Sequence, residues 1–513
     1  MSGRTQQEHT PFETYENDIQ SWLLSRLNKQ IEKISEVRLA TQSNFDNLSA
    51  GNVRVIIASF TPLERAFLVI NQKPDSFFND VLKDLVTETT TPWEDTVKSK
   101  VVNALTGFYT DDVDFIKKSM LHYFREAFLP EYNYFTSFND KKSPDKKYKI
   151  KFVKNFAEID ATIKADKKTI CVILSIEGAH SLAREVPNLN ALRREQGRSH
   201  RRDPADFTLL IDYVKNIEKL KALDFVPLFV SINHHFWNGL GGHAKSLMKL
   251  IGTLVSQDEG LNEGLKEIGK EVINYLLRKD NGPRILIDIK HMSPLCRQEF
   301  YAFIKTKYWT KNDKFPLVCS HTGIVSKRRT LNALIKQDDD AELHDDTNYL
   351  HENSINLCEE DVLIIAETNG LIGLQLDEKR IAGNNIITVI KNDDSLGEAD
   401  LRMQYVKVLC ANIFEIVKTV NAAKGWNLIA IGSDYDGLIN HLDFYPSAAD
   451  MPTLKKDMLS FFKNPTEISQ PGFNYALTLP EINRLMFGLS AEDIIDKIFA
   501  GNTMSFLQNN FNR

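Results

Sequence analysis

Short runs of branched apolar residues recur along the chain, each too short to form a free-standing helix and each flanked by polar segments. An apolar run without polar alternation is typical of a parallel strand that is buried on both faces. The runs predict seven strands, at Val53–Phe60, Val172–Glu177, Val226–Asn233, Ile285–Lys290, Pro316–Ser320, Leu371–Leu376 and Leu428–Ser433.

Helical patterns lie between most of these strands. In Asn262–Leu277 and Met403–Val420 the apolar residues stand three and four positions apart, which predicts amphipathic helices. Strand–helix alternation over most of the chain favours a barrel or a doubly wound sheet. No GxGxxG or GxxxxGK[ST] motif follows a strand, which counts against a nucleotide-binding sheet.

Two connections are too long for simple crossovers, at about residues 61–169 and 328–369. The first is mostly helical and aromatic, and its lysine-rich stretch near Lys141–Lys151 is predicted to be a solvated loop. With no internal repeat and no Pro/Gly/Ser linker, we expect one domain over residues 1–513 that carries both connections as insertions.

Composition narrows the classes of function. The chain has 63 basic and 69 acidic residues, a net charge of −6, which argues against nucleic acid or a membrane surface as a general partner. It has no apolar run of about 18 residues, the length that a membrane span needs. The first residues lack the pattern of a secretory signal, and five cysteines are scattered without a CxxC pair. A reduced, cytoplasmic location is the default expectation.

Metal-binding residue types stand at the ends of five predicted strands. They are Glu177, His234, His291, His321 and Asp434. In a parallel β/α barrel the carboxyl ends of all strands meet on one face, where active sites lie. Imidazole and carboxylate together are the ligands of zinc and similar divalent metals. The pattern therefore predicts a metal site at that face.

Each of these residues also has a simpler interpretation. A single histidine after a strand is commonly a loop residue, and an aspartate in a sequence such as DYDG often only supports a turn. The recurrence at five strand ends favours the site, because independent coincidences at all five are improbable.

The segments around these residues resemble those of a known family, the membrane (renal) dipeptidases. The resemblance extends from about Asn44 to Phe506 and rests on blocks in the same order. They are IEGAHSL (176–182), SINHHFWN (231–238), the glycine-containing segment 260–273, IDIKHMS (287–293), CSHTG (319–323) and IGSDYDG (431–437). The resemblance implies a TIM-type (β/α)₈ barrel and a metal-dependent peptidase with two zinc ions.

The resemblance also implies roles for the five residues. Glu177 is similar to the carboxylate that bridges the two metals, and His291 and His321 to the ligands of the second metal. His234 is similar to the histidine that contacts the substrate and stabilises the oxyanion. Asp434 is similar to the residue that orients the bridging water and carries its proton.

The implied substrate is a dipeptide or a similar small amide, and the family often dimerises. Arg328 or Arg329 is similar to the arginine that binds the terminal carboxylate of the substrate. The spacing from His321 is shorter than the family pattern, so the choice between the two arginines stays open. Lys290 departs from the small residue expected there and is either a charge beside the metal ligands or part of the barrel wall.

The first strand of the family barrel, which ends in a His-x-Asp or His-x-His pair that holds the first metal, is missing from the sequence. Before His122 the chain has only His9, in a polar context, and residues 15–40 have a helical pattern. A closed barrel of this kind needs eight strands and the pattern predicts seven. We expect that the natural protein extends upstream; the alternative is a protein that has lost the first metal.

Three functions therefore compete. The first is a zinc-dependent dipeptidase that uses metal-activated hydroxide. The second is a barrel hydrolase of another small amide, ester or lactone, because substrate choice lies in loops. The third is a metal-poor binding protein without activity.

Overall fold

The computed structural model describes residues 41–68, 121–184, 204–247, 255–336, 347–383 and 385–512. Within these ranges eight strands form one sheet and two short strands form a second. The strands of the main sheet are β1 (Val55–Phe60), β2 (Lys149–Phe152), β3 (Thr169–Ile176), β4 (Phe229–Ser231), β5 (Leu286–Asp288), β6 (Val318–Thr322), β7 (Leu371–Leu374) and β8 (Ile429–Ile431). The small sheet pairs β9 (Ile468–Ser469) with β10 (Ala476–Leu477).

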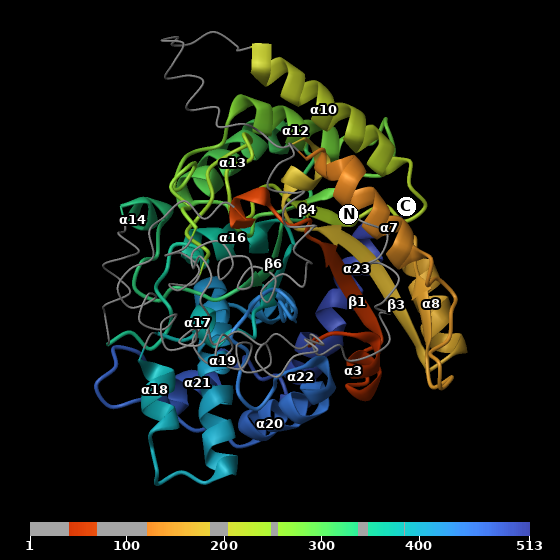
Figure 1. Ribbon diagram of the computed structural model, residues 1–513. Coiled ribbons are helices and arrows are strands. Elements are labelled where there is room, and N and C mark those ends of the chain that lie inside the picture. The colour runs from red at the N-terminus through yellow and green to blue at the C-terminus, as the bar shows by residue number, and fades with distance from the viewer. Residues whose placement is uncertain are drawn as a thin grey trace, which may run out of the picture.

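Each of the seven predicted apolar runs overlaps one strand of the main sheet. These strands are paired in the order β1-β3-β4-β5-β6-β7-β8, and every pair is parallel. The sheet curls into a half-barrel with helices around it, so the predicted α/β class and TIM-type arrangement are confirmed (Figure 1).

The prediction of a solvated loop near Lys141–Lys151 was wrong for the last residues of this stretch. Strand β2 begins at Lys149 and pairs in parallel with the first half of β3. Its sequence KIKF alternates, so that Ile150 and Phe152 are buried while the two lysines are partly exposed. Lysines at every second position are compatible with a strand that has one solvated face, because their side chains all point to that face.

Fifteen α-helices are described in the same ranges. They are α3 (Phe45–Ala50), α7 (Leu129–Thr136), α8 (Phe156–Ala165), α10 (Pro204–Lys221), α12 (Glu267–Leu277), α13 (Pro294–Lys307), α14 (Leu331–Ile335), α16 (Glu359–Glu367), α17 (Glu378–Ile381), α18 (Ile386–Lys391), α19 (Glu398–Val420), α20 (Met451–Lys463), α21 (Leu479–Leu485), α22 (Ala491–Asp496) and α23 (Asn502–Asn510).

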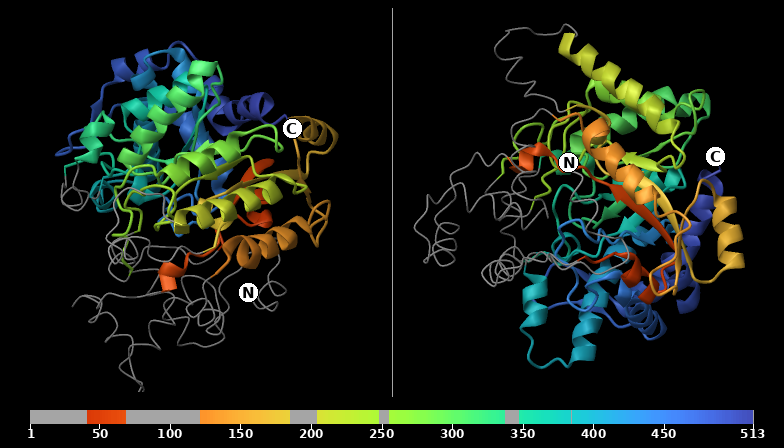
Figure 2. Two further views of the ribbon diagram at one scale, coloured as in Figure 1. Left: turned by 90° about the horizontal axis from the view of Figure 1, so that it is seen from above. Right: turned by 45° about the vertical axis from the view of Figure 1, so that its right-hand side comes forward.

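The two predicted helices are α12 and α19. Helix α12 begins at Glu267, later than the pattern predicted, because the residues before it form isolated bridges with a loop that includes Gly241 and His243. Figures 1 and 2 show the strands at the centre. Helices α10, α12 and α13 lie along one side of them, and α19 and α20 lie on another side. Among the described residues no helix is both long and apolar enough to cross a membrane.

The predicted missing strand coincides with a gap in the described part of the sheet. Strand β1, which the resemblance places second in the barrel, lies at one end of the strand order and β8 lies at the other. Within the described ranges no strand joins these two edges. His9 and the helical pattern of residues 15–40 lie outside the described residues. The division into one domain with two insertions stays a prediction.

A buried ion pair connects the helix after β5 to the helix before β7. Arg297 of α13 and Asp361 of α16 lie 3.0 Å apart, and both are almost fully buried. Arg297 also donates to the carbonyls of Ser354 and Asn356, while Tyr301 donates to the other carboxylate oxygen. The guanidinium therefore compensates the buried charge of Asp361 and donates to two backbone carbonyls.

We predict that Arg297→Met lowers the free energy of unfolding by about 3–5 kcal/mol, because it leaves a buried carboxylate uncompensated. Urea unfolding followed by circular dichroism measures the effect. The matched control is Lys314→Met, which breaks the half-exposed pair with Glu367 and should change stability by less than about 1 kcal/mol. Equal unfolding midpoints for the two variants would contradict the prediction.

Candidate metal centre

Three of the predicted residues meet at the carboxyl ends of the strands. Glu177 directly follows β3, His291 lies just beyond β5, and His321 lies within β6. Nε2 of His291 is 2.9 Å from Oε1 of Glu177, and Nε2 of His321 is 3.4 Å from the same oxygen. All three side chains are at most 15% exposed. We call this group the Glu177 centre.

Asp288 orients the imidazole of His321. The buried Asp288 carboxylate accepts hydrogen bonds from the hydroxyls of Ser231 and Ser320 at 2.6 and 2.7 Å. Because the Ser320 hydroxyl has one hydrogen and gives it to Asp288, it accepts from Nδ1–H of His321, 2.9 Å away. The Nε2 lone pair of His321 is thereby directed at Glu177. A ligand histidine held in this way through its other nitrogen is typical of metal sites.

The charges of the Glu177 centre suit a cation. Burial, and then nearby positive groups, hold the pKa values of His291 and His321 well below the usual range. Although burial raises the pKa of Glu177, the electrostatic interactions with His321, His234 and Lys290 lower it overall. The centre therefore presents a carboxylate and two neutral imidazoles, a donor set typical of zinc and related metals.

The hydrogen-bond geometry of the centre also fits a metal. Nδ1 of His291 is buried without a hydrogen-bond partner in the described part of the chain, and its Nε2 faces Oε1 of Glu177 at 2.9 Å. The backbone of His291 has a φ of +68°, in the left-handed region. A non-glycine residue in this region stores strain of about 1–3 kcal/mol, which the surrounding structure has to impose.

Asp434 lies beside the Glu177 centre at the end of β8. Its Oδ2 is 3.7 Å from Nε2 of His321 and accepts a hydrogen bond of 2.6 Å from the amide of Gln375. Burial, and next the charge of Glu177, raise the pKa of Asp434 well above its ordinary value. A carboxyl group of this kind takes up a proton more readily than an exposed aspartate does.

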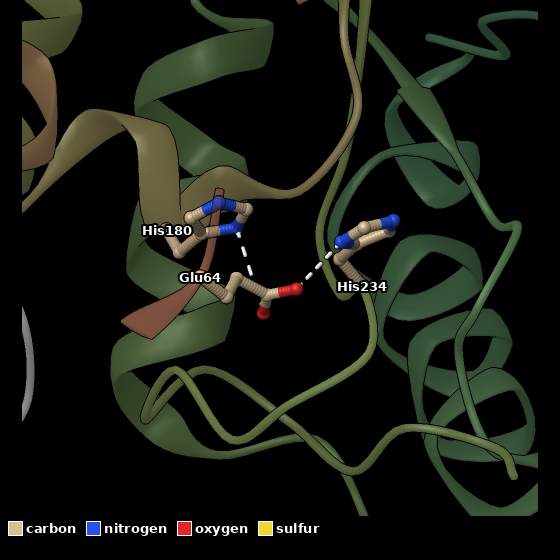
Figure 3. Close-up of side chains that lie close together, drawn as sticks. All are labelled: Glu64, His180 and His234. Atoms are coloured by element: carbon tan, nitrogen blue, oxygen red, sulfur yellow. Dashed lines mark hydrogen bonds and ion pairs between the residues drawn. The ribbon is translucent and has the colours of Figure 1, made fainter. Parts of the chain in front are cut away.

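His234 belongs to a second group, with Glu64 and His180 (Figure 3). Nδ1 of His234 is 2.6 Å from Oε2 of Glu64, and its Nε2 is 3.9 Å from Oε1 of Glu177. The ring therefore lies between the two carboxylates. Burial lowers the pKa of His234, but Glu64 and then Glu177 raise it above the usual value overall.

The sequence analysis missed Glu64 as a candidate. Glu64 comes four residues after β1, in TPLE, and its position follows the same rule that identified Glu177 and Asp434. His180 was noted only as part of the block after Glu177. The available signal was an acidic residue just beyond a strand end. It was overlooked because the apolar run VRVIIASF stops before Thr61.

The two predicted arginines differ in their surroundings. Arg329 is about half exposed and pairs with Glu359 at the start of α16 at 2.7 Å, while Arg328 is partly buried in the same loop. A third arginine, Arg380, was not predicted. It donates to the carbonyl of Ser246, and its positive charge contributes to lowering the pKa values of His291 and Asp434.

The Lys290 side chain is buried, with an exposed fraction of 2%. Its Nζ has no hydrogen-bond partner among the described residues, and burial lowers its pKa to about 8. Of the two interpretations left open by the sequence, a charge near the predicted metal ligands is the one with support, because the buried ammonium contributes to lowering the pKa of Glu177.

The sequence matches no family model and no curated protein sequence. Among solved structures, the chain is similar to a metallopeptidase from Rhodobacter sphaeroides with a phosphinate mimic of L-Ala-D-Ala, at 12% identity, a TM-score of 0.42 and coverage of 96% and 97% of the two chains. It is also similar to a metallopeptidase described as dipeptidase AC (12% identity, TM-score 0.44, 96% and 97%) and to the probable dipeptidase PvdM from Pseudomonas aeruginosa (11%, 0.39, 95% and 98%). At these values the function has to be argued from the residues of the site.

We predict that the histidines of the site titrate differently in metal-free protein. His234 should titrate above the usual value of about 6.5, because Glu64 favours its charged form, while buried His291 and His321 should stay neutral well below it. NMR of ¹³C-labelled histidine measures these values. In the control Glu64→Gln, the pKa of His234 should fall below its wild-type value, since burial remains and the charge and hydrogen bond of Glu64 are lost. An unshifted His234 in that variant would contradict the assignment.

Proposed function

We propose that the protein is a metal-dependent hydrolase that cleaves the peptide bond of dipeptides or similar small amides. The observation that carries this proposal is the convergence of two imidazoles on one oxygen of Glu177, with Asp434 beside them. Glu177, His291 and His321 would hold the metal, and zinc fits this donor set. A bound ion would polarise the substrate carbonyl and make hydroxide available near neutral pH.

Asp434 is suited to carry the proton of the reaction. Its raised pKa lets it accept a proton from the attacking water and pass it to the leaving amine. The hydrogen bond from Gln375 holds its Oδ2 near His321, on the side of the Glu177 centre. Transfer through one carboxyl group requires no other acid at the site.

His234 is suited to bind the substrate and stabilise the oxyanion. Its Nδ1 is held by Glu64, so its Nε2 points toward the Glu177 centre. With the raised pKa of His234, Nε2 carries a hydrogen and can donate to the oxygen of the reacting carbonyl. Removal of one such donor typically costs about 10²–10³ in kcat.

A free carboxylate on the substrate needs a cation near the centre. Arg380 is our first candidate, because its charge acts on both His291 and Asp434. Arg328, from the sequence prediction, is the second. Arg329 is the least suited of the three, because its guanidinium is engaged by Glu359.

We predict that His291→Ala and His321→Ala each lower kcat/KM for a dipeptide panel by more than about 100-fold, because even a residue that only orients a ligand typically contributes 10–100-fold in affinity or activity. Ser320→Ala removes the support of His321 and one of the two hydroxyl donors to Asp288, but no ligand, and should therefore give an intermediate loss of about 10–100-fold. The measurement is turnover together with elemental analysis of bound metal.

The matched control for this series is His122→Gln, since His122 belongs to neither histidine group and should leave turnover and metal content unchanged. Full turnover in both His291→Ala and His321→Ala would rule out the proposed centre. Metal binding without hydrolysis of any amide, ester or lactone would favour a binding protein instead.

We predict that Arg380→Gln raises KM about 10-fold or more for dipeptides with a free terminal carboxylate, because a charged hydrogen bond is worth about 1.5–3 kcal/mol. The same variant should have little effect on the corresponding dipeptide amides. Arg329→Gln is the control and should behave like the wild type. A carboxylate-specific loss in Arg328→Gln, and not in Arg380→Gln, would assign the role to Arg328.

A further inference from the structure

The group formed by Glu64, His180 and His234 joins three neighbouring strand ends. Glu64 precedes a short 3₁₀ turn after β1, His180 lies in the turn Ala179–Leu182 after β3, and His234 lies just beyond β4. Each residue is no more than 6% exposed. In Figure 3 the two imidazoles lie on opposite sides of the Glu64 carboxylate. We call this group the Glu64 cluster.

The hydrogen bonds of His180 direct a lone pair at Glu64. Nε2 of His180 is 2.8 Å from the carbonyl oxygen of Pro62, and since a carbonyl only accepts, Nε2 carries the hydrogen. In the neutral ring Nδ1 is then an acceptor. It is buried without a hydrogen-bond partner among the described residues, and Oε1 of Glu64 lies 3.9 Å from it.

Two acceptors that face each other in a buried place are unfavourable unless a cation or a donor lies between them. A protonated His180 would not repair the contact, because 3.9 Å is too long for a hydrogen bond. A metal ion between Nδ1 and Oε1 would satisfy both atoms. The bond from Nε2–H of His180 to a backbone carbonyl is the usual support of a metal-binding histidine.

The surroundings hold the other ligand atoms in place, and a glycine keeps a side chain away from Nδ1 of His180. Glu64 is fixed by His234 through Oε2 and by the backbone N–H of Phe236 through Oε1, at 2.6 and 3.2 Å. Gly178 has a φ of +91°, and a Cβ there would come within 2.4 Å of Nδ1 of His180. A side chain at this position would therefore occupy the space in front of the lone pair.

We propose that the Glu64 cluster is a second metal site, which binds a divalent ion of the zinc class through Glu64, His180 and His234. One carboxylate and two imidazoles form the same kind of donor set as the Glu177 centre, and one ligand atom from each residue lies within 4.8 Å of the others. The resemblance places the ligands of the other ion on a strand before β1, and the sequence contains no such ligands. This site takes them from the ends of β1, β3 and β4.

The second site is compatible with the role proposed for His234. Binding of an ion at Nδ1 releases the proton shared with Glu64 and leaves the hydrogen of the neutral ring on Nε2. Nε2–H then still faces the Glu177 centre, 3.9 Å from Oε1 of Glu177. The inference adds an ion to the proposed hydrolase, but it does not rest on hydrolytic activity and is tested without it.

The experiment uses the full chain, freed of metal by a chelator and titrated with Co²⁺, with elemental analysis and the visible spectrum as readouts. We expect two equivalents per wild-type chain. Glu64→Gln and His180→Gln should each retain one equivalent and lose the spectral component of the Glu64 cluster. His291→Ala should retain one equivalent with the complementary spectrum, and the control His122→Gln should bind two.

Circular dichroism and thermal melting of each metal-free variant establish that it is folded. Glu64→Gln is nearly isosteric, so it serves as the test if His180→Gln does not fold. One equivalent in the wild type, or two retained in both Glu64→Gln and folded His180→Gln, would overturn the second site. If Glu64→Gln and His180→Gln both retain two equivalents while His291→Ala loses one, the Glu177 centre is supported and only the second site is rejected. If Glu64→Gln and folded His180→Gln each lose one equivalent while His291→Ala loses none, the Glu64 cluster is supported and the Glu177 centre is rejected.

Discussion

The parallel direction of the strands is the constraint on which the site depends. Because every strand of the main sheet runs the same way, residues that follow different strands are brought to one edge, however far apart they are in the sequence. Glu64 and Asp434 are 370 positions apart in the sequence. In the structure, however, His234 lies between Glu64 and Glu177, and His321 lies near both Glu177 and Asp434. The loops after the strands then need only to direct each side chain inward.

The second requirement of the site is a balance of buried charge. Glu64, Glu177, Asp288 and Asp434 place four carboxyl groups near one another, with little contact with water. Asp288 is satisfied by hydrogen bonds from two serines, whereas Glu64 and Glu177 are surrounded by imidazoles. Lys290 and the cations that we propose supply opposite charge. A buried carboxylate without such compensation would be costly, so the imidazoles and the carboxylates depend on one another.

Much of the fold could be predicted because burial on both faces leaves a clear sequence signal. All seven apolar runs became strands, and Glu177, His291 and His321 meet as the strand-end rule predicted. Strand β2 was missed because a lysine at every second position suggested a solvated loop, while its two apolar residues contact the core. The start of α12 was misplaced because the residues before it pair with a distant loop, which no local pattern reveals.

The sequence by itself determined the class of fold, the order of the strands along the chain and the residue types at their ends, since these follow from local periodicity. Only the tertiary structure decided which side chains share a neighbour. It placed His234 between Glu64 and Glu177, turned His180 toward Glu64, and brought the charge of Arg380 close enough to act on the site. The physical reason is that contacts between side chains of different strands depend on the curvature of the sheet and on the path of each loop. Neither of these produces a pattern at a fixed spacing in the sequence.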